Sequence, residues 1–158
     1  NNFYAGITPE EQQILTDLYY HEVIHREFFR TAITATTGDS SMVLPDLEFD
    51  YGNLDFNDRD AVLATAKALE DTGVAAYNGA GRLLTSPDLL LIAGKIVSVE
   101  ARHASAIRSL VNPDSADFAG DDVVEPVTGL DVASTPAEIL AVAGGFITTR
   151  FTANNLPS

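Results

Sequence analysis

Two copies of the motif Glu-x-x-His, Glu22–His25 and Glu100–His103, constrain the fold most, because each lies on the apolar stripe of an expected helix. Apolar residues recur at steps of three and four around both motifs, which places each polar pair on a helix face that should be buried. A carboxylate and an imidazole that face a hydrophobic core cost free energy unless a positive charge binds them. The pattern therefore predicts a helical bundle with a metal site inside it. The two stripes are Leu15, Leu18, Glu22, His25, Phe29 and Ala32, and Leu89, Ala93, Ile96, Glu100, His103, Ile107 and Leu110.

A third expected helix carries a single charge, Glu70, on an otherwise apolar face that also contains Leu63, Gly73 and Tyr77. Two Glu-x-x-His helices combined with single-Glu helices form the ligand set of di-iron and di-manganese carboxylate bundles. A mixture of carboxylate oxygen and imidazole nitrogen suits iron or manganese better than calcium. These residues predict a site for two iron or manganese ions, with Glu70 as a bridging ligand.

Each of these residues also has an interpretation without metal. The two Glu–His pairs could form a buried hydrogen-bonded network, in which loss of one partner would cost about 3–5 kcal/mol. Glu70 could form a salt bridge with Lys67 or Arg102 near the helix surface. The third histidine, His21, lies about 100° from the apolar stripe and is expected at the surface or in support of a ligand. Tyr77 is expected to pack in the core.

Composition excludes several classes of protein. A chain of 158 residues with 46% hydrophobic content is sufficient for one domain with a core, so we expect a single domain over residues 1–158. A net charge of −14 repels nucleic acid and anionic membranes. No run approaches the roughly 18–20 apolar residues of a membrane span. The chain has no cysteine, which excludes disulfides and thiolate metal sites.

The expected helix starts are marked by a hydroxyl residue followed by proline, at Thr8-Pro9, Ser86-Pro87 and Thr135-Pro136. The hydroxyl suits the N-cap, and proline suits the first helical position. In two of these starts a glutamate at the third helical position, Glu11 or Glu138, is expected to complete a capping box. A fourth start is expected where Asn57 precedes Asp58 and Asp60.

These signals predict helices over about 9–36, 58–84, 87–111 and 136–151. Residues 38–56 form a long crossover, and residues 112–134 form a second long loop. Only Thr85 and Ser86 separate the second and third expected helices, which we therefore expect to be antiparallel neighbours. A bundle with one long crossover followed by a tight hairpin is typical of ferritin-like folds.

The segments Leu69–Tyr77 and Val99–Ala104 resemble the ferritin-like domain of exported bacterial and plant desiccation-related proteins. The segment His21–Phe29 is similar to the second helix of that family, and the likeness covers roughly residues 1–111. The resemblance implies an all-α, ferritin-like four-helix bundle with an additional C-terminal helix. It also implies export to the periplasm, the cell envelope or the exterior. By motif match it assigns the metal site to Glu22, His25, Glu70, Glu100 and His103, with no catalytic residue beyond them.

One feature departs from the family. Its first helix should donate another Glu, but Asn2-Phe3-Tyr4 resembles only the tail of that helix and supplies no such ligand. With one expected Glu absent, we expect two ions or only one. We expect the missing part of the first helix upstream of Asn1. Otherwise the expected helix over 136–151, a second copy of the chain or a partner chain would cover the groove that it leaves.

Two functions follow from these residues. The first is a dinuclear iron or manganese oxidoreductase, ferroxidase-like or peroxide-consuming, with metal ions as its partners. The alternative is a non-catalytic protein of the stress response, desiccation or the cell envelope, in which the polar residues are vestigial or hold a structural ion. A storage cage has weaker support, because the long loops and the missing helix do not favour a closed shell.

Overall fold

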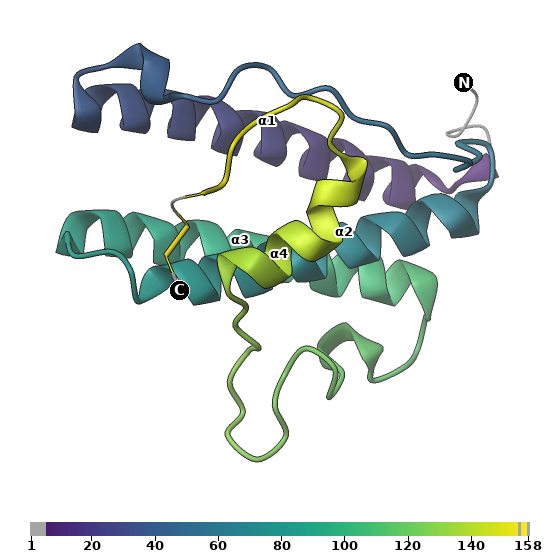
Figure 1. The fold of residues 1–158 in the computed structure, drawn as a ribbon. Helices are drawn as coiled ribbons and strands as arrows, with labels where there is room; N and C mark the ends of the chain where they lie inside the picture. Colours follow the sequence, from purple (N-terminus) through teal and green to yellow (C-terminus); the bar gives the residue numbers. More distant parts are fainter. Residues whose placement is uncertain (1–5, 155, 158) are drawn as a thin grey trace.

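The computed structural model describes residues 6–154 and 156–157. Figure 1 shows three long helices, α1 (Pro9–Thr37), α2 (Arg59–Gly81) and α3 (Pro87–Val111), and a short one, α4 (Pro136–Ala143). The described residues form only two isolated β-bridges and no named strand. The prediction of an all-α bundle is therefore confirmed, whereas the part played by Asn2-Phe3-Tyr4 lies outside the described residues.

Side-chain caps start the helices where the sequence predicts them. The hydroxyls of Thr8, Ser86 and Thr135 accept hydrogen bonds from the backbone of their own helices, and Asp58 caps α2. Thr135 and Glu138 form a complete capping box. The capping box expected at Thr8 is incomplete, because the carboxylate of Glu11 binds Arg59 instead. A side chain far away in the sequence therefore competes successfully with the local cap.

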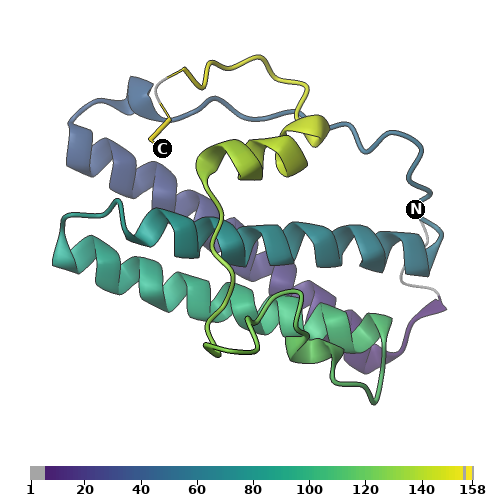
Figure 2. The same ribbon diagram turned by 60° about the horizontal axis from the view of Figure 1, so that its bottom comes forward.

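The helices run in the directions that a long crossover and a tight hairpin impose. The crossover spans the length of the molecule, so α1 and α2 run in the same direction and α3 runs back (Figure 1). Figure 2 shows α2 and α3 side by side as an antiparallel pair, with α4 packed across α2. None of the helices in the described part of the chain is long and apolar enough to cross a membrane.

The core lies between α2 and α3. Leu63 on α2 and Ile107 on α3 are fully buried, and the other buried apolar side chains come from the same two helices: Val74, Ala75, Ile96 and Ala104. By contrast, Glu11 is the only residue of α1 that is buried among those described. The helix pair α2–α3 therefore holds the buried core, and α1 packs on it with half-buried side chains such as Phe29, which stacks on Tyr77.

Two of the expected helices end earlier than predicted. The helix expected over 136–151 ends at Ala143 and is followed by a 3₁₀ turn, Gly144–Phe146. The glycine pair Gly144–Gly145 weakens the helix by about 1 kcal/mol per residue relative to alanine. The next residues bond instead to the crossover, where the Thr148 N–H donates to the carbonyl of Glu48. The helix expected over 58–84 ends at Gly81. The assignment of residues 1–158 to a single domain stays a prediction.

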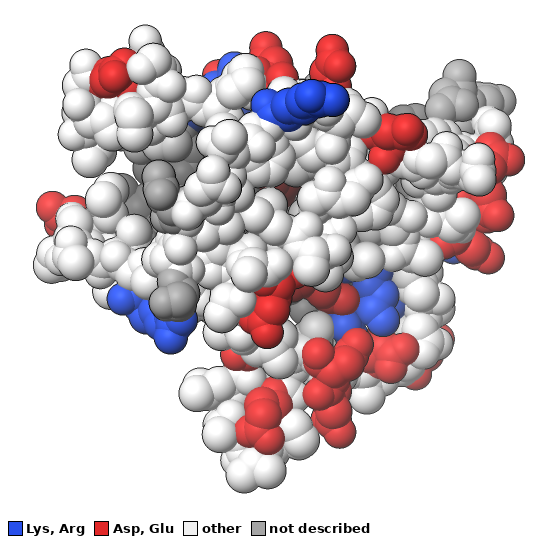
Figure 3. All heavy atoms as spheres, in the orientation of Figure 1, with Lys and Arg blue, Asp and Glu red and all other residues white. Residues whose placement is uncertain are grey.

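The acidic surface predicted from the composition is visible in Figure 3. Acidic side chains are spread over this face and gather over the loop between α3 and α4. One acid of this loop is bound by a buried arginine: Arg108, which is only 2% exposed, donates to both carboxylate oxygens of Asp122 and of Asp71. The loop is therefore tied to α2 and α3 by a bidentate arginine.

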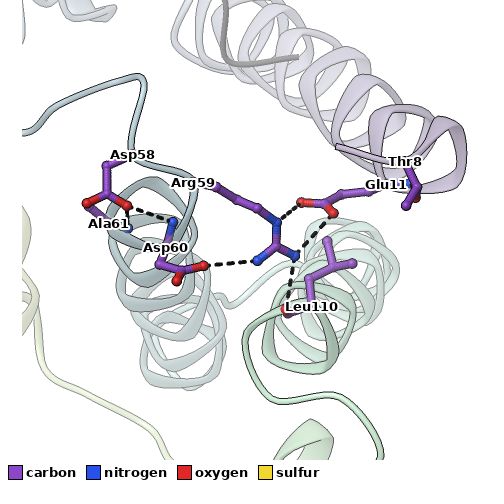
Figure 4. A network of polar contacts seen from close by, with 7 residues as sticks. All are labelled: Thr8, Glu11, Asp58, Arg59, Asp60, Ala61 and Leu110. Carbon is purple, nitrogen blue, oxygen red and sulfur yellow. Dashed lines mark hydrogen bonds and ion pairs between the residues drawn. The ribbon is translucent and has the colours of Figure 1, made fainter. Parts of the chain in front are cut away.

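A second arginine ties α1 to the helix pair (Figure 4). Arg59 donates from Nε and Nη2 to the two carboxylate oxygens of Glu11, at 2.8 and 3.1 Å. The same Nη2 donates to the carbonyl of Leu110 at 3.2 Å. Glu11 is 5% exposed, so its carboxylate is shielded from water and Arg59 is the partner that compensates its burial. The contact of Arg59 with Asp60, by contrast, is exposed.

We expect Arg59→Ala to lower the free energy of unfolding by about 2–3 kcal/mol, because it leaves the buried carboxylate of Glu11 without its partner. This is less than the roughly 3–5 kcal/mol of a fully buried pair, since Arg59 is itself partly exposed. Urea unfolding would measure the change. Asp60→Ala removes the exposed partner of the same arginine and should change stability little. Equal loss of stability in the two variants would contradict the stabilising role of the Glu11–Arg59 pair.

A close backbone contact at Gly79 fixes the segment that leads into α4. The N–H of Ser134 donates to the carbonyl of Ala75, and a Cβ on Gly79 would lie 1.8 Å from the carbonyl oxygen of Ser134. Only glycine leaves space for the chain to cross α2 at this point. At Gly73, in the same helix, a Cβ would meet nothing within 4 Å.

We predict opposite effects for alanine at these two glycines. Gly79→Ala should destabilise the fold by about 1–3 kcal/mol, because the chain before α4 must move away from α2. Gly73→Ala should stabilise it by about 0.5–1 kcal/mol through higher helix propensity. Thermal or urea unfolding of both variants tests this, and a Gly79→Ala variant as stable as Gly73→Ala would show that the contact is not restrictive.

Candidate metal centre

Three helices bring four of the predicted residues together. Glu22 comes from α1, Glu70 from α2, and Glu100 and His103 from α3. Each offers one donor atom, and the four donor atoms all lie within 4.8 Å of one another. These four residues, called the carboxylate cluster below, could hold a metal ion.

His103 lies at the centre of the carboxylate cluster and is only 3% exposed. Its Nδ1 is 3.1 Å from Oε1 of Glu22, 3.2 Å from Oε2 of Glu100 and 3.5 Å from Oε2 of Glu70. Burial alone lowers the pKa of His103, but the carboxylates of Glu100, Glu22 and Glu70 outweigh it and raise the pKa to about 11. A nitrogen surrounded by three carboxylates marks the place where the cluster favours positive charge.

Glu100 presents its two oxygens to two different histidines. Oε1 is 3.1 Å from Nδ1 of His25, and Oε2 is 3.2 Å from Nδ1 of His103. Glu100 is 4% exposed, so water does not hydrate either of its oxygens well. A carboxylate between two imidazole nitrogens has the arrangement of a ligand shared between two cations.

Three buried atoms of these residues have no hydrogen-bond partner: Nδ1 of His25, Nδ1 of His103 and Oε2 of Glu100. They lie close to oppositely charged atoms, but not in hydrogen-bonding geometry. Because an unsatisfied buried polar group costs about 1–3 kcal/mol, such a group calls for an explanation. Cations bound beside Glu100 would give each of the three a partner, and the donor chemistry suits iron or manganese. The residues present therefore fit a metal better than the metal-free hydrogen-bonded network.

Glu22 differs from the prediction, because its side chain is 48% exposed rather than buried. The described residues leave the outer face of α1 uncovered here, and Tyr19, Tyr20 and Ile24 are exposed on it. Partial burial raises the pKa of Glu22, but the contacts with His103 and Glu100 and the charge of His25 together outweigh it and lower the pKa below its usual value. The carboxylate cluster is thus accessible to solvent on the side of Glu22.

Glu70 faces the cluster from α2, and burial is the main cause that raises its pKa. Among the ion pairs of the described residues it meets His103 only, and neither Lys67 nor Arg102 pairs with it. The alternative of a surface salt bridge is therefore wrong. Since Glu70 does not meet His25, the geometry favours Glu100 over Glu70 as the shared ligand.

His25 lies beside the carboxylate cluster. Its Nδ1 is 3.1 Å from Glu100 and 3.7 Å from Glu22, and its ring centre is 6.4 Å from that of His103. The two histidines thus meet opposite oxygens of one carboxylate. All five predicted ligands are close together, four in the carboxylate cluster and His25 next to it.

Two further residues contact the site. His21 is exposed and its Nδ1 lies 2.9 Å from Nε2 of His103, which agrees with its expected place at the surface or in support of a ligand, although the sequence did not identify His103 as the partner. In the sequence, only its position directly before the predicted ligand Glu22 indicated that His21 could lie near the site. Tyr77 stacks on Phe29, as the prediction of core packing requires. Burial and the charge of Glu100 raise the pKa of Tyr77, which keeps the phenol neutral.

A family model described as a ferritin-like domain matches residues 2–113. The match includes α1, α2 and α3 with all five predicted ligands, and it ends before α4. No curated protein and no solved structure matches the chain. The family match covers most of the chain, and the helix order and the long crossover are those of a ferritin-like fold. This chain therefore belongs to the ferritin-like domain family.

Proposed function

We propose that the chain binds a pair of iron or manganese ions and acts in a redox reaction with dioxygen or a peroxide. The observation that carries the proposal is the position of Glu100, with one buried oxygen facing His25 and the other facing His103. The proposed ligands are Glu22, His25, Glu70, Glu100 and His103.

In this proposal the ligands are divided between two positions. His103 and Glu70, whose side chains contact each other, would serve the first, and His25 would serve the second. Glu100 contacts both histidines and belongs to both positions. Glu22 also belongs to both, because its Oε1 is 3.1 Å from His103 and 3.7 Å from His25. Each position therefore combines one imidazole with several carboxylate oxygens, which suits iron or manganese.

Bound there, two such ions would supply the electron pair that reduces dioxygen or a peroxide. The protein contributes the surroundings. Buried Glu100 and His103 hold their positions on helix α3, and half-exposed Glu22 leaves one side accessible to a small oxidant. We also propose, from the resemblance to exported proteins alone, that the chain works outside the cytoplasm.

A non-catalytic role is the competing proposal. The described residues supply five protein ligands, whereas paired sites of this class use six. A site with an incomplete ligand set suits a single structural ion, which would raise the melting temperature without turnover. Stress, desiccation and envelope functions belong to this alternative.

We predict that chelator-treated protein binds two ions per chain when it is titrated with Mn(II) or, anaerobically, with Fe(II). Glu100→Gln should lower the affinity by more than the roughly 10–100-fold that loss of an outer partner costs, because both positions lose a charged ligand. Glu27→Gln is the matched control, since Glu27 is an exposed acid on α1. Elemental analysis and calorimetric titration would measure both quantities.

The stoichiometry separates the two proposals. Two ions, with consumption of dioxygen or peroxide by the iron or manganese form, support the redox site. One ion that raises the melting temperature without turnover supports the structural role. Failure to bind either metal, or equal affinity of Glu100→Gln and Glu27→Gln, would contradict the proposed site.

A further inference from the structure

A contact between two histidines lies on the side of His103 that faces away from the carboxylates. Nδ1 of His21 is 2.9 Å from Nε2 of His103, and the two ring planes differ by only 5°. The ring centres are 5.2 Å apart, much farther than the two nitrogens, so the rings meet edge to edge rather than face to face. This alignment points the lone pair of one ring nitrogen at the N–H of the other.

Such a bond needs one donor and one acceptor, and the two assignments have different consequences. If His103 donates from Nε2, its Nδ1 is free to offer a lone pair to a cation among Glu22, Glu70 and Glu100. If His21 donates instead, a neutral His103 carries its proton on Nδ1 and cannot bind a metal there. The direction of this single hydrogen bond therefore decides whether His103 can act as a ligand.

The surroundings of His103 favour donation from Nε2. Its Nδ1 faces the carboxylates, 3.1 Å from Oε1 of Glu22 and 3.2 Å from Oε2 of Glu100, so a cation held by these oxygens would meet the lone pair of Nδ1. An imidazole that offers Nδ1 to a cation carries its proton on Nε2, which is the nitrogen 2.9 Å from His21. Nδ1 of His21 is then the acceptor.

We propose that His21 is a positioning residue, which accepts a hydrogen bond from Nε2 of His103 and keeps Nδ1 of His103 directed at the metal site. This inference rests on the proposed metal site. Histidine ligands of metals generally donate their second N–H to a partner that fixes tautomer and ring orientation. Here the partner is an imidazole rather than a carboxylate, so it adds no further negative charge beside three carboxylates.

The position of His21 gives this contact a second consequence. His21 precedes Glu22 on α1, whereas His103 lies on α3. The bond therefore connects α1 to α3 at the level of the metal site. It sets the distance between the carboxylate of Glu22 and the imidazole that it must meet.

The test compares two substitutions of His21 by titration with Mn(II). His21→Ala removes the acceptor and should weaken binding about 10–100-fold. His21→Asn should restore most of the affinity, because the amide oxygen can take the position of Nδ1 and accept the same hydrogen bond. Tyr20→Ala, which removes an exposed ring from the same helix, should bind like the wild type. Circular dichroism of the chelator-treated variants checks that all of them fold.

A second readout is specific for the hydrogen bond. In ¹⁵N NMR spectra of zinc-loaded wild type, which is diamagnetic, Nε2 of His103 should carry the proton and show a coupling across the hydrogen bond to Nδ1 of His21. A bond in which His21 donates instead would place the proton on Nδ1 of His21 and leave Nε2 of His103 without one.

The outcomes separate this inference from the function on which it rests. If the wild type binds neither Mn(II) nor Zn(II), both are overturned. If it binds metal and His21→Ala binds equally well, or the proton lies on Nδ1 of His103, only the role of His21 is overturned. Weaker binding by His21→Ala together with rescue by His21→Asn supports the role of His21.

Discussion

The meeting of three carboxylates at one buried imidazole is the interaction on which the rest of this structure depends. Glu22, Glu70 and Glu100 repel one another, and burial makes that repulsion stronger than it would be in water. A protonated His103 compensates only part of this charge, which the pKa of about 11 reflects. A cation bound to the cluster would relieve this repulsion, and stability lost at a site is commonly exchanged for function.

The bundle supports this arrangement unevenly. The helices α2 and α3 share the apolar core around Leu63 and Ile107, and they hold Glu70, Glu100 and His103 in place. By contrast, α1 buries little of its own surface. It is attached by the pair Glu11–Arg59 near its start, by His21 at the level of the site and by the stacking of Phe29 on Tyr77. Changes on α1 should therefore affect the affinity of the proposed metal site more than they affect the stability of the core.

The sequence predicted what depends on local patterns and missed what depends on distant partners. On α3 the apolar stripe predicted the burial of Glu100 and His103 correctly, because α2 covers that face. On α1 the same kind of stripe placed Glu22 in the core, yet its side chain is half exposed, since periodicity identifies a face but not what covers it. Contacts such as Glu11–Arg59 and His21–His103 join residues far apart in the sequence, so helix spacing alone cannot predict them.

X-ray diffraction at the iron or manganese absorption edge, from crystals loaded with that metal, would locate the bound ions. If Glu100 is shared between two ions, two anomalous peaks should lie about 3.5–4 Å apart on either side of it, one next to His103 and Glu70 and the other next to His25. Peaks confined to the acidic loop between α3 and α4, with none at Glu100, would contradict the proposed metal site.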